Sequence, residues 1–288
     1  MQPASSPYKA RRLIGANRPD ARVSDLHVFT NNGNLVLAMA TFPNIPVTAS
    51  GSYKFAADLT FTFKIDNNSA VSFADSARNT EFGGTIVNPD AMDADIELEV
   101  EFDDMGNPSL TTSGLTAEQE DMVNLFTGLR DDPFIRGPQI GRNVAAIVVE
   151  IPQSFVLGNQ STILVWATAR AGQLKVSGVK QHELGARALR SQCPQPQCNA
   201  LDGPDLNLRN ETSPHRYSTD LGNNIPDVVI YDTSRPALFP NGRLLTDDVV
   251  DIVATFPSGQ NILGNDAPFP STNDKPFLAV FPYYAAPH

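Results

Sequence analysis

Apolar and polar residues alternate along much of this chain, and the alternation predicts β-strands. Between Phe55 and Ile65 every second residue is apolar, and most residues between them are polar. A period of two buries one face of a strand and leaves the other face in water. Residues 66–69, with the sequence Asp-Asn-Asn-Ser, favour a turn. We therefore predict that this strand forms a hairpin with a second strand around Val71 and Phe73.

A second alternating segment, residues 96–103, carries acidic residues on its polar face. This face has two interpretations, a platform for cations or a sheet face in contact with water, and we favour the second. Residues 144–151 and 162–168 are apolar on both faces, which predicts that they form central strands. Further strands are expected at residues 26–30, 35–42, 174–179, 228–231 and 249–256. The acidic residues of the alternating segment are Glu97, Glu99, Glu101 and Asp103.

One helix is well indicated by the sequence. Thr116 and Gln119 have the spacing of a capping box at a helix N-terminus. Met122, Leu125 and Phe126 then form an apolar stripe at helical spacing, and Gly128 suits the position after a helix. These signals predict a helix between residues 117 and 127.

The order of these elements predicts a mainly β protein with one folded domain. Residues 1–22 are expected to form an N-terminal arm, and residues 23–288 a single β-rich domain. Within it, an irregular insertion at about residues 185–227 is rich in Pro, Asn, Asp, Gly and Ser. We expect a β-sandwich-like fold with long loops and one or two short helices.

Composition limits the partners that the protein can have. The 288 residues include 21 Lys and Arg against 32 Asp and Glu, which gives a formal net charge of −11. This balance opposes binding to nucleic acids and to anionic membrane surfaces, because both rely on Lys and Arg. No apolar run approaches the roughly 20 residues of a transmembrane helix, so we expect no transmembrane segment. Residues 1–14 lack the apolar core of a secretory signal.

The cysteines Cys193 and Cys198 are separated by four residues. This spacing allows a small disulfide loop or half of a metal site. We favour the disulfide because no second cysteine pair or nearby group of histidines completes a zinc site. A disulfide in turn favours an oxidising compartment.

Candidate chemistry is concentrated in short irregular segments that contain Asp. Nucleophile-elbow, P-loop and dinucleotide-binding motifs are absent from the sequence, and no two of the four histidines have the spacing of a helical zinc motif. Carboxylates beside Asn and backbone carbonyls in loops are typical ligands of calcium. The alternatives are that these carboxylates cap turns and helices, pair with Arg130 and Arg243, or act in acid–base catalysis. The candidate ligands are Asp131, Asp132, Asp247, Asp248 and Asp274.

Several separated segments resemble the bacterial domain-of-unknown-function family numbered 4331. They are residues 23–29, 128–134, 241–252 and 273–283, and the chain also ends in Pro287–His288 as such proteins commonly do. The resemblance extends over most of the chain. It implies a periplasmic or extracellular location and supplies no catalytic residues. Members of this family often begin with a segment that contains histidine near an acid, whereas residues 1–22 contain no histidine.

Three functions remain open at this point. The first is a non-catalytic extracytoplasmic binding, structural or accessory module that a bound cation such as calcium stabilises. The second is a metal-dependent hydrolase that uses the loop carboxylates as ligands. The third is a haem-binding or redox-complex subunit with His27, His215 or His288 as an axial ligand.

Aromatic residues near the end of the chain raise the question of a partner. We favour the interpretation that they pack on the sandwich as a final strand, and the alternative is a contact surface for a protein partner or a second copy of the chain. These residues are Phe269, Phe277, Phe281, Tyr283 and Tyr284.

Overall fold

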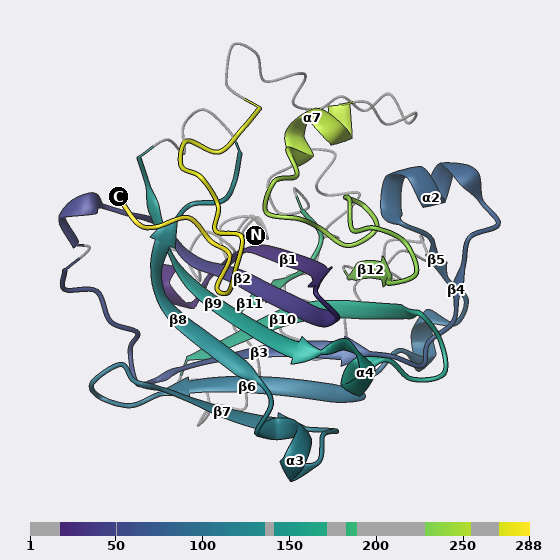
Figure 1. The fold of residues 1–288 in the computed structure, drawn as a ribbon, viewed down its shortest axis with the longest axis horizontal. Coiled ribbons are helices and arrows are strands. Elements are labelled where there is room, and N and C mark those ends of the chain that lie inside the picture. Colours follow the sequence, from purple (N-terminus) through teal and green to yellow (C-terminus); the bar gives the residue numbers. More distant parts are fainter. Residues whose placement is uncertain (1–17, 50, 136–140, 172–182, 189–227, 255–270) are drawn as a thin grey trace, which may run out of the picture.

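Two antiparallel β-sheets pack face to face in the computed structural model, which describes residues 18–49, 51–135, 141–171, 183–188, 228–254 and 271–288 (Figure 1). Sheet A has the strand order β1 (Val23–Asn31), β2 (Asn34–Ile45), β9 (Asn143–Pro152) and β8 (Asn124–Asp131). Sheet B has the order β11 (Glu183–Gly185), β10 (Thr162–Ala171), β3 (Leu59–Asp66), β6 (Ile96–Phe102) and β7 (Pro108–Ser113), and β12 (Val229–Asp232) also pairs with β10.

Short elements connect the strands of these sheets. β4 (Val71–Ser72) and β5 (Thr85–Ile86) form a small separate ladder. The α-helices are α2 (Ser76–Phe82), α3 (Ala117–Glu120), α4 (Gln153–Val156) and α7 (Val249–Ala254). The 3₁₀ helices are η1 (Pro19–Ala21), η2 (Val47–Ala49) and η3 (Pro89–Ala91).

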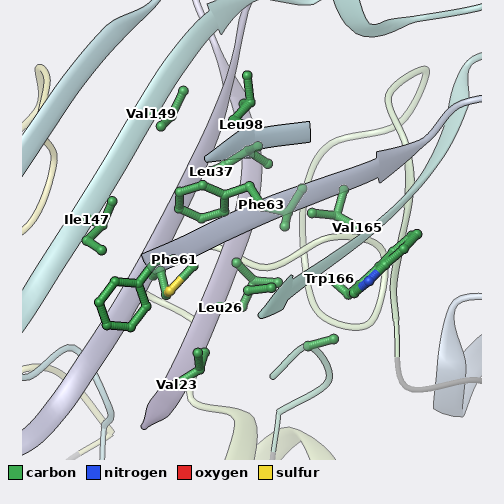
Figure 2. Packing of buried hydrophobic residues seen from close by; sticks show 14 of the residues in the cluster. Val23, Leu26, Leu37, Phe61, Phe63, Leu98, Ile147, Val149, Val165 and Trp166 are labelled. Carbon is green, nitrogen blue, oxygen red and sulfur yellow. The ribbon is translucent and has the colours of Figure 1, made fainter. Parts of the chain in front are cut away.

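The main core lies between the inner faces of the two sheets. Leu37 of β2 and Val149 of β9 are opposite each other in sheet A, and both are fully buried. They belong to the same apolar cluster as Phe61 and Phe63 of β3, and Figure 2 shows these side chains meeting between the sheets. The period of two in residues 55–65 therefore reflects a real buried face, although β3 itself begins at Leu59. The mainly β, sandwich-like fold is confirmed.

The outer face of sheet A is also covered. Alternate residues of its central strands, such as Ala38 and Val148, pack in a second cluster with Tyr283 and Tyr284 from the C-terminal segment. Figure 1 shows this segment, in yellow, running across the sheet. Strands buried on both faces must be apolar throughout, which explains why residues 144–151 read as a central strand. Phe277, Phe281, Tyr283 and Tyr284 do pack on the sandwich, and Phe269 lies outside the described residues. Residues 271–288 contain no strand, so that part of the prediction is wrong.

The predicted helix at residues 117–127 is mostly wrong. The capping box of Thr116 and Gln119 is present, but the helix that it begins has only four residues. The chain then enters β8, in which Leu125 pairs with Val149 and Phe126 with Val148. Leu125 and Phe126 are partly buried on opposite faces of this edge strand. Over so short a segment, apolar residues on both faces of a strand cannot be distinguished from a helical stripe. Pairing with β9 decides the structure here.

The predicted strand at residues 249–256 is also wrong, because residues 249–254 form α7. β-Branched residues predominate in this segment and favour a strand by propensity. The side chain of Asp248 accepts a hydrogen bond from the backbone N–H of Asp251, which supports the first turn of the helix. Val249 and Val250 then pack with Phe134 and Phe239 in a small separate cluster. Tertiary packing outweighs propensity at this position.

The predicted hairpin around residues 66–69 does not form. Asp66 is buried, and its carboxylate accepts hydrogen bonds from the backbone N–H groups of Asn68 and Ser69. The turn is therefore present, but the strand that follows it pairs with β5 instead of β3.

The acidic face of β6 points toward basic partners, since Glu97 pairs with Lys64 and Glu99 with Arg170.

Some predictions concern residues outside the described ranges. They are the strand at residues 174–179, the disulfide between Cys193 and Cys198, most of the N-terminal arm and most of the insertion at about residues 185–227. Within the described residues, no helix is long and apolar enough to cross a membrane.

Candidate metal centre

Asp131 is the residue around which the candidate site is built. It is the last residue of β8, where it pairs with Asn143 of β9, and its side chain is fully buried. Its Oδ2 atom accepts a hydrogen bond from Nδ2 of Asn273 at 2.6 Å. Its Oδ1 atom lies 2.9 Å from Nε2 of His288. A carboxylate at a strand end thus meets two residues of the C-terminal segment, and Figure 1 shows the C-terminus beside the end of β8.

The C-terminal segment supplies the other two side chains of the cluster. Oδ2 of Asp274 lies 3.4 Å from Nε2 of His288 and accepts a hydrogen bond from the backbone N–H of Gly141 at 2.8 Å. The backbone of His288 is positioned by Asn143, whose Oδ1 atom accepts its N–H at 2.9 Å. One donor atom each from Asp131, Asp274 and His288 lie within 4.8 Å of one another. Imidazole nitrogens and carboxylate oxygens in this arrangement are metal ligands in many proteins.

The two neighbouring carboxylates of Asp131 and Asp274 favour a positive charge between them. Burial raises the pKa of Asp131, and the nearby charge of Asp274 raises it further, whereas Asn273 and His288 lower it. The amino group of Lys275 donates a hydrogen bond to the backbone carbonyl of Pro287 at 2.7 Å. A protonated His288 or a bound cation would offset the repulsion between the two carboxylates.

Asp132, a predicted ligand, lies away from this cluster. Burial, together with the charges of Asp25 and Asp131, raises its pKa to about 7. Its Oδ1 atom accepts a hydrogen bond from the backbone N–H of Phe134 at 3.1 Å. Adjacent carboxylates at the end of one strand therefore have separate surroundings, as the period of two in a strand leads one to expect.

Asp247 and Asp248 have capping roles in the structure. Oδ2 of Asp247 accepts hydrogen bonds from the backbone N–H groups of Phe239 at 2.9 Å and Leu244 at 2.8 Å. Asp248 caps the first turn of α7 through its bond with Asp251. Of the five predicted ligands, the structure brings only Asp131 and Asp274 together.

A second polar cluster, at Asp25, His27, Arg243 and Tyr284, was not predicted. Arg243 is 1% exposed and forms a bidentate ion pair with Asp25 of β1, in which Nη2 and Oδ2 are 2.9 Å apart. A polar residue in a strand usually faces water, but the outer face of sheet A is covered by the C-terminal segment. The recurrence of Asp25, His27 and Phe29 on one strand face was the signal available in the sequence.

His27 belongs to this second cluster and has a fully buried ring. Its Nδ1 atom lies 3.1 Å from the backbone carbonyl of Leu244, and its Nε2 atom is 3.9 Å from Oδ2 of Asp25. Burial and the charge of Arg243 lower its pKa to about 3, although Asp25 opposes this effect. The ring of Tyr284 lies edge-on to it, with the centroids 6.2 Å apart. His27 is therefore neutral and enclosed by protein. His215, another of the predicted haem ligands, lies outside the described residues.

Comparison with family models, curated proteins and solved structures found no match in any of the three. The class of protein that the fold and site define is a β-sandwich with a candidate metal centre at the end of one sheet.

Proposed function

We propose that this protein is a non-catalytic, extracytoplasmic binding module in which a divalent cation fastens the C-terminal segment, residues 271–288, to sheet A. The observation that supports this most directly is the convergence of Asp131, Asp274 and His288. Asp131 and His288 are 157 positions apart in the sequence, so a cation bound by both would link the strand end to the end of the segment. Such a link stabilises the folded state because the unfolded chain has no preformed site.

The position of the segment gives this link a structural purpose. Tyr283 and Tyr284 cover apolar residues on the outer face of sheet A, including Val36 and Ala146. An uncovered apolar face of this kind would attract other chains.

The resemblance to family 4331 supports an extracytoplasmic location. A protein partner or a second copy of the chain is the class of ligand that we propose for the module.

Thermal unfolding of chelated and metal-loaded protein tests the proposal. At a free metal concentration 100-fold above the Kd, binding to the folded state alone adds about 2.7 kcal/mol to the free energy of unfolding, and the Tm rises. The variant Asp274→Asn should lose this increase, because it removes one of the two charged ligands. Glu118→Gln, which changes an exposed acid on α3, should retain it. The same Tm with and without divalent ions would contradict the proposal.

A metal-dependent hydrolase is the second candidate, and one observation favours it. The cluster offers three protein ligands, and Asp274 is exposed while His288 is half-buried. Catalytic zinc sites commonly combine three protein ligands with an open position for water. Metal-dependent turnover of an ester or phosphoester panel, lost in Asp274→Asn and retained in Glu118→Gln, would favour the enzyme over the module.

A further inference from the structure

The donor atoms of the candidate centre differ from those of a calcium site. Calcium takes six to eight oxygen ligands, from carboxylates, carbonyls and water. The cluster of Asp131, Asp274 and His288 instead contributes one imidazole nitrogen and two carboxylate oxygens. Nitrogen ligands suit zinc and related transition ions, because these ions are softer than calcium and accept imidazole well.

Distances within the cluster also suit a small ion. Bonds of about 2.0–2.1 Å in a tetrahedral arrangement place neighbouring ligand atoms roughly 3.3 Å apart. Nε2 of His288 lies 2.9 Å from Oδ1 of Asp131 and 3.4 Å from Oδ2 of Asp274. These two separations are close to that value, and the third, between the carboxylate oxygens of Asp131 and Asp274, is within 4.8 Å, so movement of the side chains would centre an ion.

Neighbouring groups hold each ligand in position. Asn273 donates a hydrogen bond to the second carboxylate oxygen of Asp131, which leaves Oδ1 directed at His288. Gly141 donates its N–H to Asp274, and Asn143 accepts the N–H of His288. Outer partners of this kind orient the ligands of metal sites and strengthen binding. Every ligand of the cluster thus has a supporting contact from a separate part of the backbone or a neighbouring amide.

We infer that the centre selects Zn²⁺ over Ca²⁺, with Asp131, Asp274 and His288 as its three protein ligands and water as the fourth. This inference rests on the proposed function, because it names the ion that fastens the C-terminal segment. It proposes zinc in place of calcium, adds His288 to the ligands and leaves out Asp132, Asp247 and Asp248.

The test uses isothermal titration calorimetry. Tag-free, chelator-treated protein is titrated with Zn²⁺ in one experiment and with Ca²⁺ in another. One Zn²⁺ per chain should bind, and Ca²⁺ should bind at least tenfold more weakly. His288→Ala should weaken Zn²⁺ binding by tenfold or more, because it removes the nitrogen ligand. The double substitution Cys193→Ser and Cys198→Ser is the control, since the spacing of these residues leaves half of a metal site open as an alternative to a disulfide, and it should leave the affinity unchanged.

The results distinguish the choice of ion from the proposed function, which is a module held together by a cation. Tight Ca²⁺ binding that is lost in Asp274→Asn, without tight Zn²⁺ binding, would overturn the choice of ion and keep the cation-fastened module. Zn²⁺ binding that is lost in the cysteine variant and kept in His288→Ala would overturn the site. Binding of neither ion would overturn the inference and the proposed function together. Cobalt substitution adds a second readout, because a tetrahedral site with these ligands should give visible absorption that His288→Ala abolishes.

Discussion

Buried polar side chains are the most informative feature at the scale of single residues. The ion pair of Asp25 and Arg243 joins β1 to the chain after β12, and both residues are less than a tenth exposed. Removing one partner of a buried pair is strongly destabilising, because the other charge is then left in a medium of low polarity. The pair therefore fixes the arrangement of two distant segments, whatever its net contribution to stability.

The substitution Arg243→Met tests this role. It should lower the free energy of unfolding by about 3–5 kcal/mol, as measured by urea denaturation. A second substitution, Asp25→Asn, should restore part of the loss. Arg235→Ala is the matched control, since Arg235 forms its ion pair with Asp232 at a half-exposed position, and it should cost at most about 1 kcal/mol. Equal losses in the two arginine variants would contradict the prediction.

His27 should make stability depend on pH. The pKa of the folded protein's His27 is about 3, below the ordinary value of 6.5, because burial and Arg243 oppose its charged form. Between these two values the unfolded chain binds a proton that the folded protein does not bind. Stability should therefore be unaffected by His27 above about pH 6.5 and should fall as the pH is lowered from there toward about 3.

Urea denaturation at several pH values measures this effect. In His27→Asn the amide can replace the hydrogen bond to Leu244, while the titrating group is lost. The difference in stability between the wild type and this variant should change on the order of 1 kcal/mol for each pH unit within that window. A difference that is constant with pH would show that His27 remains free to ionise.

At the scale of elements, the C-terminal segment is held by specific bonds as well as by apolar contacts. The hydroxyl of Tyr283 donates a hydrogen bond to Glu150 of β9 at 2.6 Å and accepts one from Asn31 of β1 at 3.0 Å. Glu150 is 8% exposed, so the bond satisfies a carboxylate that water reaches poorly. Hydrogen bonds of side chains thus help to position a segment that has no regular secondary structure.

Tyr283→Phe should weaken this attachment. Loss of a hydrogen bond to a charged group costs about 1.5–3 kcal/mol, and the ring contact with Phe29 is retained. Hydrogen exchange should report faster exchange of the Leu278 amide, which donates to the carbonyl of Tyr283, than in the wild type. Tyr53→Phe is the control, because it changes a tyrosine outside the segment. Unchanged exchange at Leu278 would contradict the prediction.

At the scale of the whole molecule, the β-sandwich and the C-terminal segment, residues 271–288, should respond differently to loss of the metal. The core between the sheets is formed by side chains that are remote from the candidate centre, such as Phe61 and Val149. Local opening of a region requires less free energy than global unfolding when few contacts hold it. Loss of the cation should therefore increase local opening of the C-terminal segment and leave the sandwich folded.

Hydrogen exchange with and without a chelator tests this separation. On chelation, amides in residues 271–288 should exchange at least tenfold faster, because the link between Asp131 and His288 is lost. Amides of β2 and β9 should be unaffected. His288→Ala without chelator should reproduce the same pattern, and a uniform increase across the molecule would indicate global destabilisation instead.

The sequence by itself determined the mainly β fold, because a period of two in apolar residues is a local signal that strand geometry produces directly. It also determined that β9 is central, since only a strand covered on both faces needs apolar residues throughout. Short segments were ambiguous: residues 122–128 have a spacing that suits both a helix and an edge strand, and pairing with β9 made residues 124–128 part of β8. Tertiary packing likewise made residues 249–254 a helix.

Only the tertiary structure decided which polar residues meet. Asp131 and Asp132 are neighbours in the sequence, yet one faces His288 and the other packs near Asp25. The distance along the chain between Asp131 and its partners leaves no local pattern from which their contact could be predicted. Register at the end of sheet A and the path of the C-terminal segment bring them together, and this is why the candidate centre is a property of the fold.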